Sequence, residues 1–127
     1  MSTRMGFQYV VLRCVPRVDR EEFVNVGVVL YCQQAEFLQA RCHVDPARLA
    51  SLAPDVDVDS VCSALAAIEA VCRGDKSAGE PGRAVMGTRF GFVKAPKSTV
   101  VQPGPVHGGT TDDPDAELDH LVARLVG

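Results

Sequence analysis

The first third of the chain carries the period-two pattern of β-strands. Residues 7–15 (FQYVVLRCV) are rich in β-branched and aromatic side chains, and Arg13 falls on the same side as three largely apolar residues. Two further runs of this kind span 24–33 and 36–44. The connections between the three runs are short, which favours antiparallel pairing of consecutive strands. The pattern therefore predicts an antiparallel meander.

The period then changes to that of helices. The segment 46–53 begins with Asp45 before Pro46, an N-cap residue followed by proline at the first helical position. The segment 60–74 has apolar residues at helical spacing and ends on glycine. The segment 113–126 has Asp113 as its N-cap candidate before Pro114, acids in its first turn and one apolar stripe. We therefore expect three helices.

The region between the second and third helices is harder to interpret. Residues 83–93 (RAVMGTRFGFV) indicate a short strand, and residues 91–112 indicate a long loop that contains Pro and Gly. Strands followed by helices are typical of an α+β domain. We expect one domain over residues 1–127, an antiparallel β-meander of about three to four strands packed with three helices.

Composition and charge narrow the function classes. The formal net charge is −3 and there is no Trp, so we do not expect a nucleic-acid partner. The chain lacks an apolar run near the roughly 18 residues of a membrane helix, and its start is typical of a strand rather than a signal peptide. We expect a cytoplasmic protein without membrane association. Residues 81–111 contain no acid but four cations, Arg83, Arg89, Lys94 and Lys97.

The five cysteines do not indicate a metal site. They form no C-x-x-C pair, whereas a tetrahedral zinc site usually shows at least one close ligand pair. Three of them lie in strand-like apolar runs, where a free cysteine behaves as a small hydrophobic residue. We expect reduced, structural thiols, no metal and no cofactor.

The motif EEFVNVGVVLY around Asn25 has two interpretations. Asn25 and Gly27 can shape a bulge or a close approach of two backbones at the start of a strand. Alternatively, Glu22 and Asn25 project polar groups into a cleft beside the sheet. Asn25 is therefore a candidate ligand-binding residue.

A second candidate site is the motif RFGFVKAPKST. It brings Arg89 and Lys97 close in sequence to the hydroxyls of Ser98 and Thr99, a combination that suits a phosphate or carboxylate. A P-loop is absent, because the chain has no GxxxxGK[ST] motif. The alternative is that Lys97 faces solvent and that Ser98 and Thr99 begin a strand.

His107 is the candidate catalytic residue. It lies between a proline and two glycines on a constrained loop, where an imidazole near Lys97 can act as a general acid or base. The alternatives are a ligand contact or a hydrogen bond that packs the loop. The chain has neither a GxSxG elbow nor a recognisable cysteine nucleophile.

Three stretches together resemble the bacterial domain of unknown function DUF3037. They are YVVLRCVPRVDREEFVNVGVVLY, KAPKSTVVQPGPVHGGTTDDP and DAELDHLVARLVG, and the resemblance covers nearly the whole chain. It implies that these elements belong to one domain, with no established activity. The positions to which it points are Arg13, Glu22, Asn25, Gly27, Arg41, Arg89, Lys97, Ser98, Thr99, Gln102, His107, Gly109 and Asp113. The family pattern has Arg where Lys97 stands, and lysine lacks the planar fork that binds anions in a bidentate way.

The same resemblance implies a function class. It points to a gene neighbourhood with HipA-like kinases, and hence to an accessory or binding protein that partners such a kinase or a toxin–antitoxin-like system. The alternative is a small enzyme that acts on a phosphorylated or nucleic-acid substrate through a Lys97/His107 site. That alternative predicts that Asn25, Arg89, Lys97, Ser98 and His107 converge in one pocket. The sequence does not decide between an accessory protein and an enzyme, and it does not indicate the oligomeric state.

Overall fold

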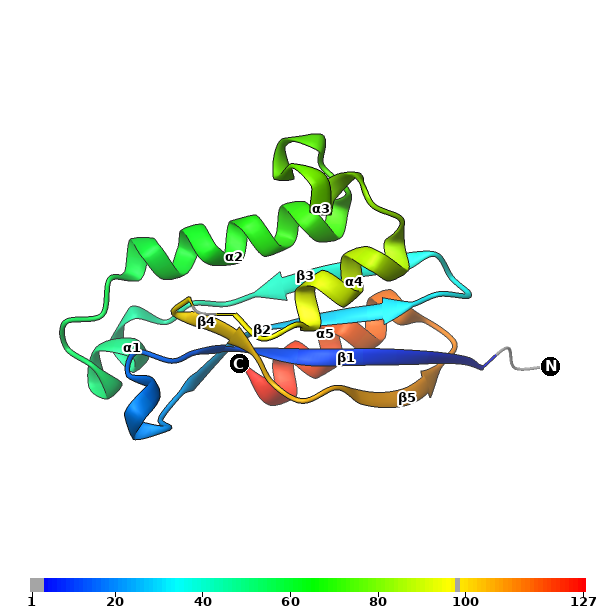
Figure 1. Cartoon of the computed structure of the whole chain (residues 1–127). Helices are drawn as coiled ribbons and strands as arrows, with labels where there is room; N and C mark the ends of the chain where they lie inside the picture. Colours follow the sequence, from blue (N-terminus) through cyan, green and yellow to red (C-terminus); the bar gives the residue numbers. More distant parts are fainter. Residues whose placement is uncertain (1–3, 98) are drawn as a thin grey trace.

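A five-stranded antiparallel sheet forms the centre of the molecule (Figure 1). The computed structural model describes residues 4–97 and 99–127. The strand order is β3-β2-β1-β4, and β5 also pairs with β1, so β4 and β5 follow one another along the same edge of β1. The strands are β1 (Met5–Cys14), β2 (Val24–Cys32), β3 (Phe37–Cys42), β4 (Val101–Pro103) and β5 (His107–Thr111).

The described part of the chain contains five helices. They are α1 (Pro46–Leu52), α2 (Val58–Arg73), α3 (Glu80–Arg83), α4 (Met86–Lys94) and α5 (Pro114–Leu125). Three of them begin at an aspartate whose carboxylate accepts hydrogen bonds from the first-turn amides, namely Asp45, Asp57 and Asp113. Two short 3-10 turns lie at Val18–Arg20 and Lys76–Ala78. None of the helices that the structure describes is long and apolar enough to cross a membrane.

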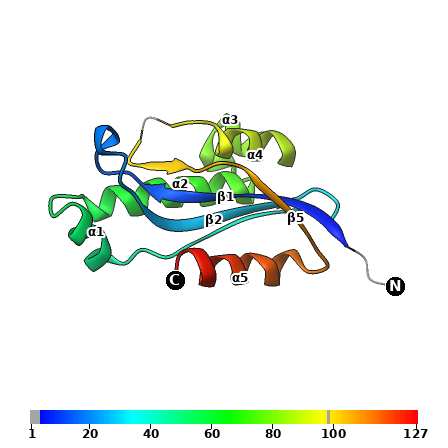
Figure 2. The same ribbon diagram turned by 90° about the horizontal axis from the view of Figure 1, so that it is seen from below.

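The sheet is covered on both faces. Figure 2 shows α2 and α4 on one side and α5 on the other. The larger core joins the sheet to α2 and α4 through residues such as Val10, Leu12, Leu65 and Phe90. The smaller core joins it to α5, and consists of Phe7, Val28, Leu30, Cys32, Leu118, Leu121 and Val126. Alternate residues of β1 therefore point to different cores, as strand geometry requires.

The predicted fold class is confirmed. The sheet is antiparallel, its first three strands form the expected meander, and helices follow near 46–53, 60–74 and 113–126. The expected short strand at 83–93 is wrong, because this segment contains most of α4. Phe90 and Val93 lie three positions apart and both enter the larger core, which stabilises a helix there.

The segment 91–112, which the sequence indicates as a loop, contains the end of α4 and strands β4 and β5. β5 has the sequence HGGTT, which has little intrinsic preference for a strand. Its backbone pairs with residues 5–9 of β1, about a hundred positions away. Long-range pairing of this kind overrides local propensity.

β1 is bordered by irregular pairing on both edges. Its register with β2 shifts between Leu12 and Arg13. On the other edge, Leu12 pairs with Pro103 and Tyr9 pairs with His107. Three residue positions along β1 therefore lie opposite four positions of the outer chain, which carries one extra residue. Bulges bend strands and re-aim side chains, and they are frequent beside functional sites. The register shift with β2 lies at Arg13, and the extra residue of the outer chain lies opposite Val10 and Val11.

Candidate binding site on the sheet

Arg13 projects from the face of the sheet that α5 covers in part. Its chain neighbours Leu12 and Cys14 are fully buried in the core on the α2 side, so Arg13 points the other way. Its partners across the neighbouring strands are Asn25 of β2 and Gln102 of β4. Three polar residues thus form a row across the sheet, which we call the Arg13 row.

The guanidinium group of Arg13 is held in place by packing. Its Cζ lies 4.1 Å from the centroid of the Phe23 ring, a cation–π arrangement. On another side it lies against Gly104, where a Cβ atom would come within 3.0 Å of Cζ and Nε. Glycine is thus required for this close approach. Within residues 4–97 and 99–127, Arg13 forms no ion pair, and its buried Nε has no hydrogen-bond partner.

Asn25 joins the Arg13 row to the end of α5. Its Nδ2 donates to the carbonyl oxygen of Leu125 at 3.1 Å, and this acceptor fixes which end of the amide carries the hydrogens. Arg48 binds the next carbonyl, that of Val126, at 2.9 Å. Both bonds satisfy carbonyls that a helix C-terminus leaves without partners. The Oδ1 atom of Asn25 is buried and has no partner among the described residues.

The remaining members of this face are partly engaged. Gln102 Nε2 donates to the carbonyl oxygen of Thr99 at 3.2 Å. His107 is exposed on β5 and stacks on Tyr9 of β1, with ring centroids 5.2 Å apart. Further along, Gly109 makes room for Phe7, whose ring would lie 2.8 Å from a Cβ atom there. Asn25, Gln102 and His107 therefore share one face of the sheet.

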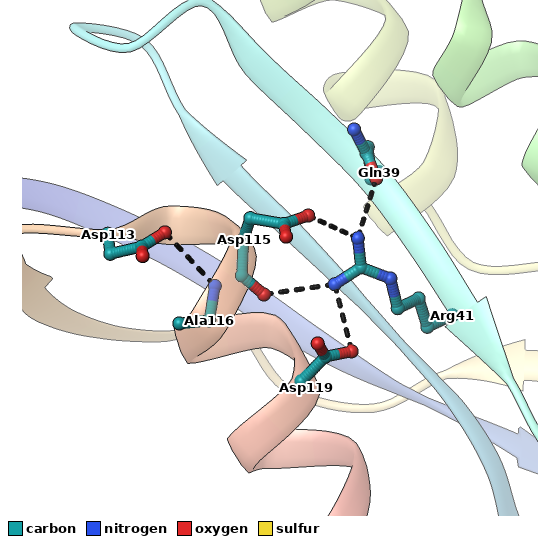
Figure 3. A network of polar contacts seen from close by, with 6 residues as sticks. All are labelled: Gln39, Arg41, Asp113, Asp115, Ala116 and Asp119. Carbon is teal, nitrogen blue, oxygen red and sulfur yellow. Dashed lines mark hydrogen bonds and ion pairs between the residues drawn. The ribbon is translucent and has the colours of Figure 1, made fainter.

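Arg41 on the same face has a different environment. Figure 3 shows its guanidinium group between Gln39 of β3 and two acids of α5. It donates to the carbonyl oxygen of Asp115 at 2.9 Å, to the Asp119 carboxylate at 3.1 Å and to Gln39 at 3.1 Å, and it also pairs with the Asp115 carboxylate. Arg41 therefore attaches α5 to the sheet.

Arg89, a predicted ligand-binding residue, also has a structural environment. It donates to the carbonyl oxygens of Ala84 and Val71, each at 3.1 Å, and to that of Cys72. Val71 and Cys72 belong to the last turn of α2, whose carbonyls lack partners within the helix. Arg89 thus caps α2 from α4.

The other predicted anion-binding residues lie on the α2 side. Lys97 donates to the carbonyl oxygens of Phe92 and Ala95, the latter at 3.0 Å. Burial lowers the pKa of Lys97 below its ordinary value. Thr99 Oγ1 donates to the carbonyl oxygen of Val101 at 2.7 Å. Ser98 lies outside the described residues.

The expected convergence of the candidate residues in one pocket is therefore not observed. Lys97 lies beside α2, whereas Asn25 and His107 lie on the face of α5. Arg89 is separate from both, at the C-terminus of α2. The arrangement groups Asn25, Gln102 and His107 and leaves Arg89, Lys97 and Thr99 elsewhere.

The cysteines are free thiols. Burial raises the pKa of Cys42 and of Cys72 to about 12, so neither is a thiolate at neutral pH. Among the residues that the structure describes, no group of three or more His, Cys, Asp and Glu side chains is placed to hold a metal ion.

Residues 9–126 match the model of a protein family described as a protein of unknown function, DUF3037. The chain belongs to the DUF3037 family. The matched range runs from β1 to the residue after α5, and therefore includes the whole Arg13 row. Neither the curated proteins nor the solved structures gave a match to this DUF3037 chain.

Sequence reasoning did not single out the central residue of this DUF3037 site. Arg13 is one of thirteen positions to which the family resemblance points, and no pattern in the sequence indicates Phe23. One signal was present, an arginine on the same side of a strand as three largely apolar residues. The bulges and Gly104, which give Arg13 its surroundings, depend on pairing between distant segments.

Proposed function

We propose that this DUF3037 protein is a binding module that holds an acidic segment of a partner protein at the Arg13 row. The observation that carries this proposal is the state of Arg13. Its guanidinium group is positioned by Phe23 and Gly104, yet it forms no ion pair within the described residues. A fixed guanidinium is well suited to a carboxylate, because its planar donors match the two oxygens.

The surroundings of Arg13 favour a protein partner. Phe23, which lies against the guanidinium group of Arg13, is 44% exposed although it is a large apolar side chain. Arginine and aromatic residues are enriched at the energetically important centres of protein interfaces. The bound segment then supplies a carboxylate to Arg13 and an apolar side chain to Phe23.

A HipA-like kinase is the proposed partner, as the family resemblance implies. In this role the DUF3037 protein is an accessory subunit rather than a catalyst. The Arg13 row then provides specificity, and docking against exposed Phe23 adds burial of apolar surface.

Isothermal titration of a purified HipA-like kinase with wild-type protein and with Arg13→Met tests this proposal. Met retains most of the apolar stem and removes the charge. We expect the variant to bind about tenfold more weakly or worse, the effect of losing a central interface arginine. The matched control is Arg83→Met on α3, which removes the same charge from an exposed site on the α2 side. Equal affinities of the two variants would contradict the proposal.

A further inference from the structure

A groove on the opposite side of the sheet has no role in the proposed partner site. It lies between α2, the segment 77–81 and the residues that follow α4, and has a volume of ≈ 350 Å³. Ile68 and Val71 of α2, both nearly buried, contribute to its lining. Phe92, Lys97 and Thr99 line it from the other side.

The groove is hollow because the flank of α2 carries small side chains. Ala64, Ala67 and Ala70 all line it, and successive members of this set are three residues apart. Residues at this spacing lie on one side of a helix. Because alanine ends at Cβ, the space between this flank and Pro81 is not filled. Among the described residues, the lining is mostly apolar, with Ser77, Lys97 and Thr99 as its polar members, and contains no acid.

Among the residues that the structure describes, Lys97 is the only cation that lines the groove. Its ammonium group lies 4.5 Å from the centroid of the Phe92 ring and donates to two carbonyl oxygens. Because an ammonium group has three donors, one remains for an additional acceptor. Among the described residues, no carboxylate forms an ion pair with Lys97. A positive charge therefore lies at an apolar cavity without a counter-charge.

We propose that this groove binds a small monocarboxylic acid with an apolar body. The carboxylate accepts from Lys97, and the body packs on Ile68 and Val71. The volume lies at the lower end of the range for small-molecule pockets, which are mostly apolar with a few polar groups that fix orientation. A nucleotide does not fit this chemistry, because its phosphates carry several negative charges and the described lining offers one cation.

The test is an NMR titration of methyl-labelled protein with 4-phenylbutyrate. We expect saturable shifts at the methyl groups of Ile68, Val71 and Ala67. The neutral analogue 4-phenylbutyramide has the same apolar body and tests the charge. We expect the amide to bind about tenfold more weakly, because it offers the Lys97 ammonium group a neutral acceptor in place of a carboxylate. Equal affinity of the acid and the amide would overturn the proposal.

Three variants localise the binding. Lys97→Met keeps the aliphatic stem and is expected to weaken 4-phenylbutyrate about tenfold. Lys94→Met removes the same charge from an exposed position on α4 and is expected to leave the affinity unchanged. Ala67→Leu, at an exposed position of α2, fills the groove and is expected to abolish the methyl shifts. Unaltered binding by Ala67→Leu, or absence of any shift at about 10 mM ligand, would contradict the assignment.

Discussion

Arg13 and Arg41 lie on the same face of one sheet and have opposite environments. Arg41 bridges β3 and α5 through four interactions, with two acids, a backbone carbonyl and Gln39. Arg13 is fixed by an aromatic ring and a glycine, and its Nε has no partner within the described part of the chain. An arginine with its donors paired to its own chain serves the fold, whereas one that is positioned but not paired is available for another molecule.

Arg89 extends this comparison to the other face. It binds three backbone carbonyls, two of them at the end of α2. All three arginines are partly buried, so burial alone does not distinguish them. The three arginines differ in the acceptors that surround each guanidinium group. Replacing each of them by methionine should therefore lower the free energy of unfolding by a different amount.

Arg89→Met should cause the largest loss of stability. The carbonyl of Cys72 loses its side-chain donor in a partly buried setting, and that of Val71 keeps only the N–H of Gly74, at a cost of about 2–3 kcal/mol in the free energy of unfolding. Urea denaturation measures this change. Arg83→Met serves as the control, because it removes an exposed charge from the same face. A loss of stability no greater than that of the control would show that Arg89 does not cap α2.

Arg41→Met should have an intermediate effect. The acids that it binds are 62% and 68% exposed, so solvent screens the ion pairs and the expected loss is about 1–2 kcal/mol. Because these pairs are screened further by salt, the difference from wild type should shrink in 1 M NaCl, where the screening length is about 3 Å. A difference that is independent of salt would mean that packing, not charge, attaches α5.

Arg13→Met should have the smallest effect of the three arginine substitutions on stability. The variant loses a cation–π contact and removes a buried donor that lacks a partner, so the two changes offset each other to within about 0.5 kcal/mol. The same urea series measures it. A destabilisation equal to that of Arg41→Met would place Arg13 among the structural arginines and would remove the basis for the partner site.

Gly104→Ala should weaken binding of the kinase without a substantial change in stability. The added methyl group meets the end of a flexible side chain at 3.0 Å, so Arg13 shifts rather than the backbone. We expect stability to change by less than about 0.5 kcal/mol, while affinity for the kinase falls several-fold because the guanidinium group is displaced. Wild-type affinity in Gly104→Ala would show that the position of Arg13 is not important.

The sequence predicted the elements whose formation depends on neighbouring residues in the chain. The first three strands and the helix caps Asp45 and Asp113 follow from period and from N-cap chemistry, and the structure confirms them. The helix α4 was missed because RFGFV contains two aromatic residues and a valine, which also favour strands. β5 was missed because its glycines matter only in relation to Phe7 on a distant strand.

The candidate site was predictable only in part. Asn25, Gln102 and His107 were identified and share one face, whereas Arg89 and Lys97 were selected for their charge. Charge along the sequence does not reveal whether backbone carbonyls already surround a cation. That depends on where helices end in space, as the contacts of Arg89 with Val71 and Cys72 illustrate.

The most direct test follows the side-chain Nε–Hε signals of the three arginines in one NMR titration. The probe is a short acidic peptide with an apolar residue, acetyl-Glu-Phe-Glu-amide, added to ¹⁵N-labelled protein. We predict that the Arg13 signal shifts in a saturable way, while the signals of Arg41 and Arg89 stay in place, because both Nη groups of Arg41 and the Nε of Arg89 are already bonded to acceptors of the chain. An unchanged Arg13 signal, or equal shifts at all three arginines, would contradict the assignment of Arg13 as the partner-binding residue.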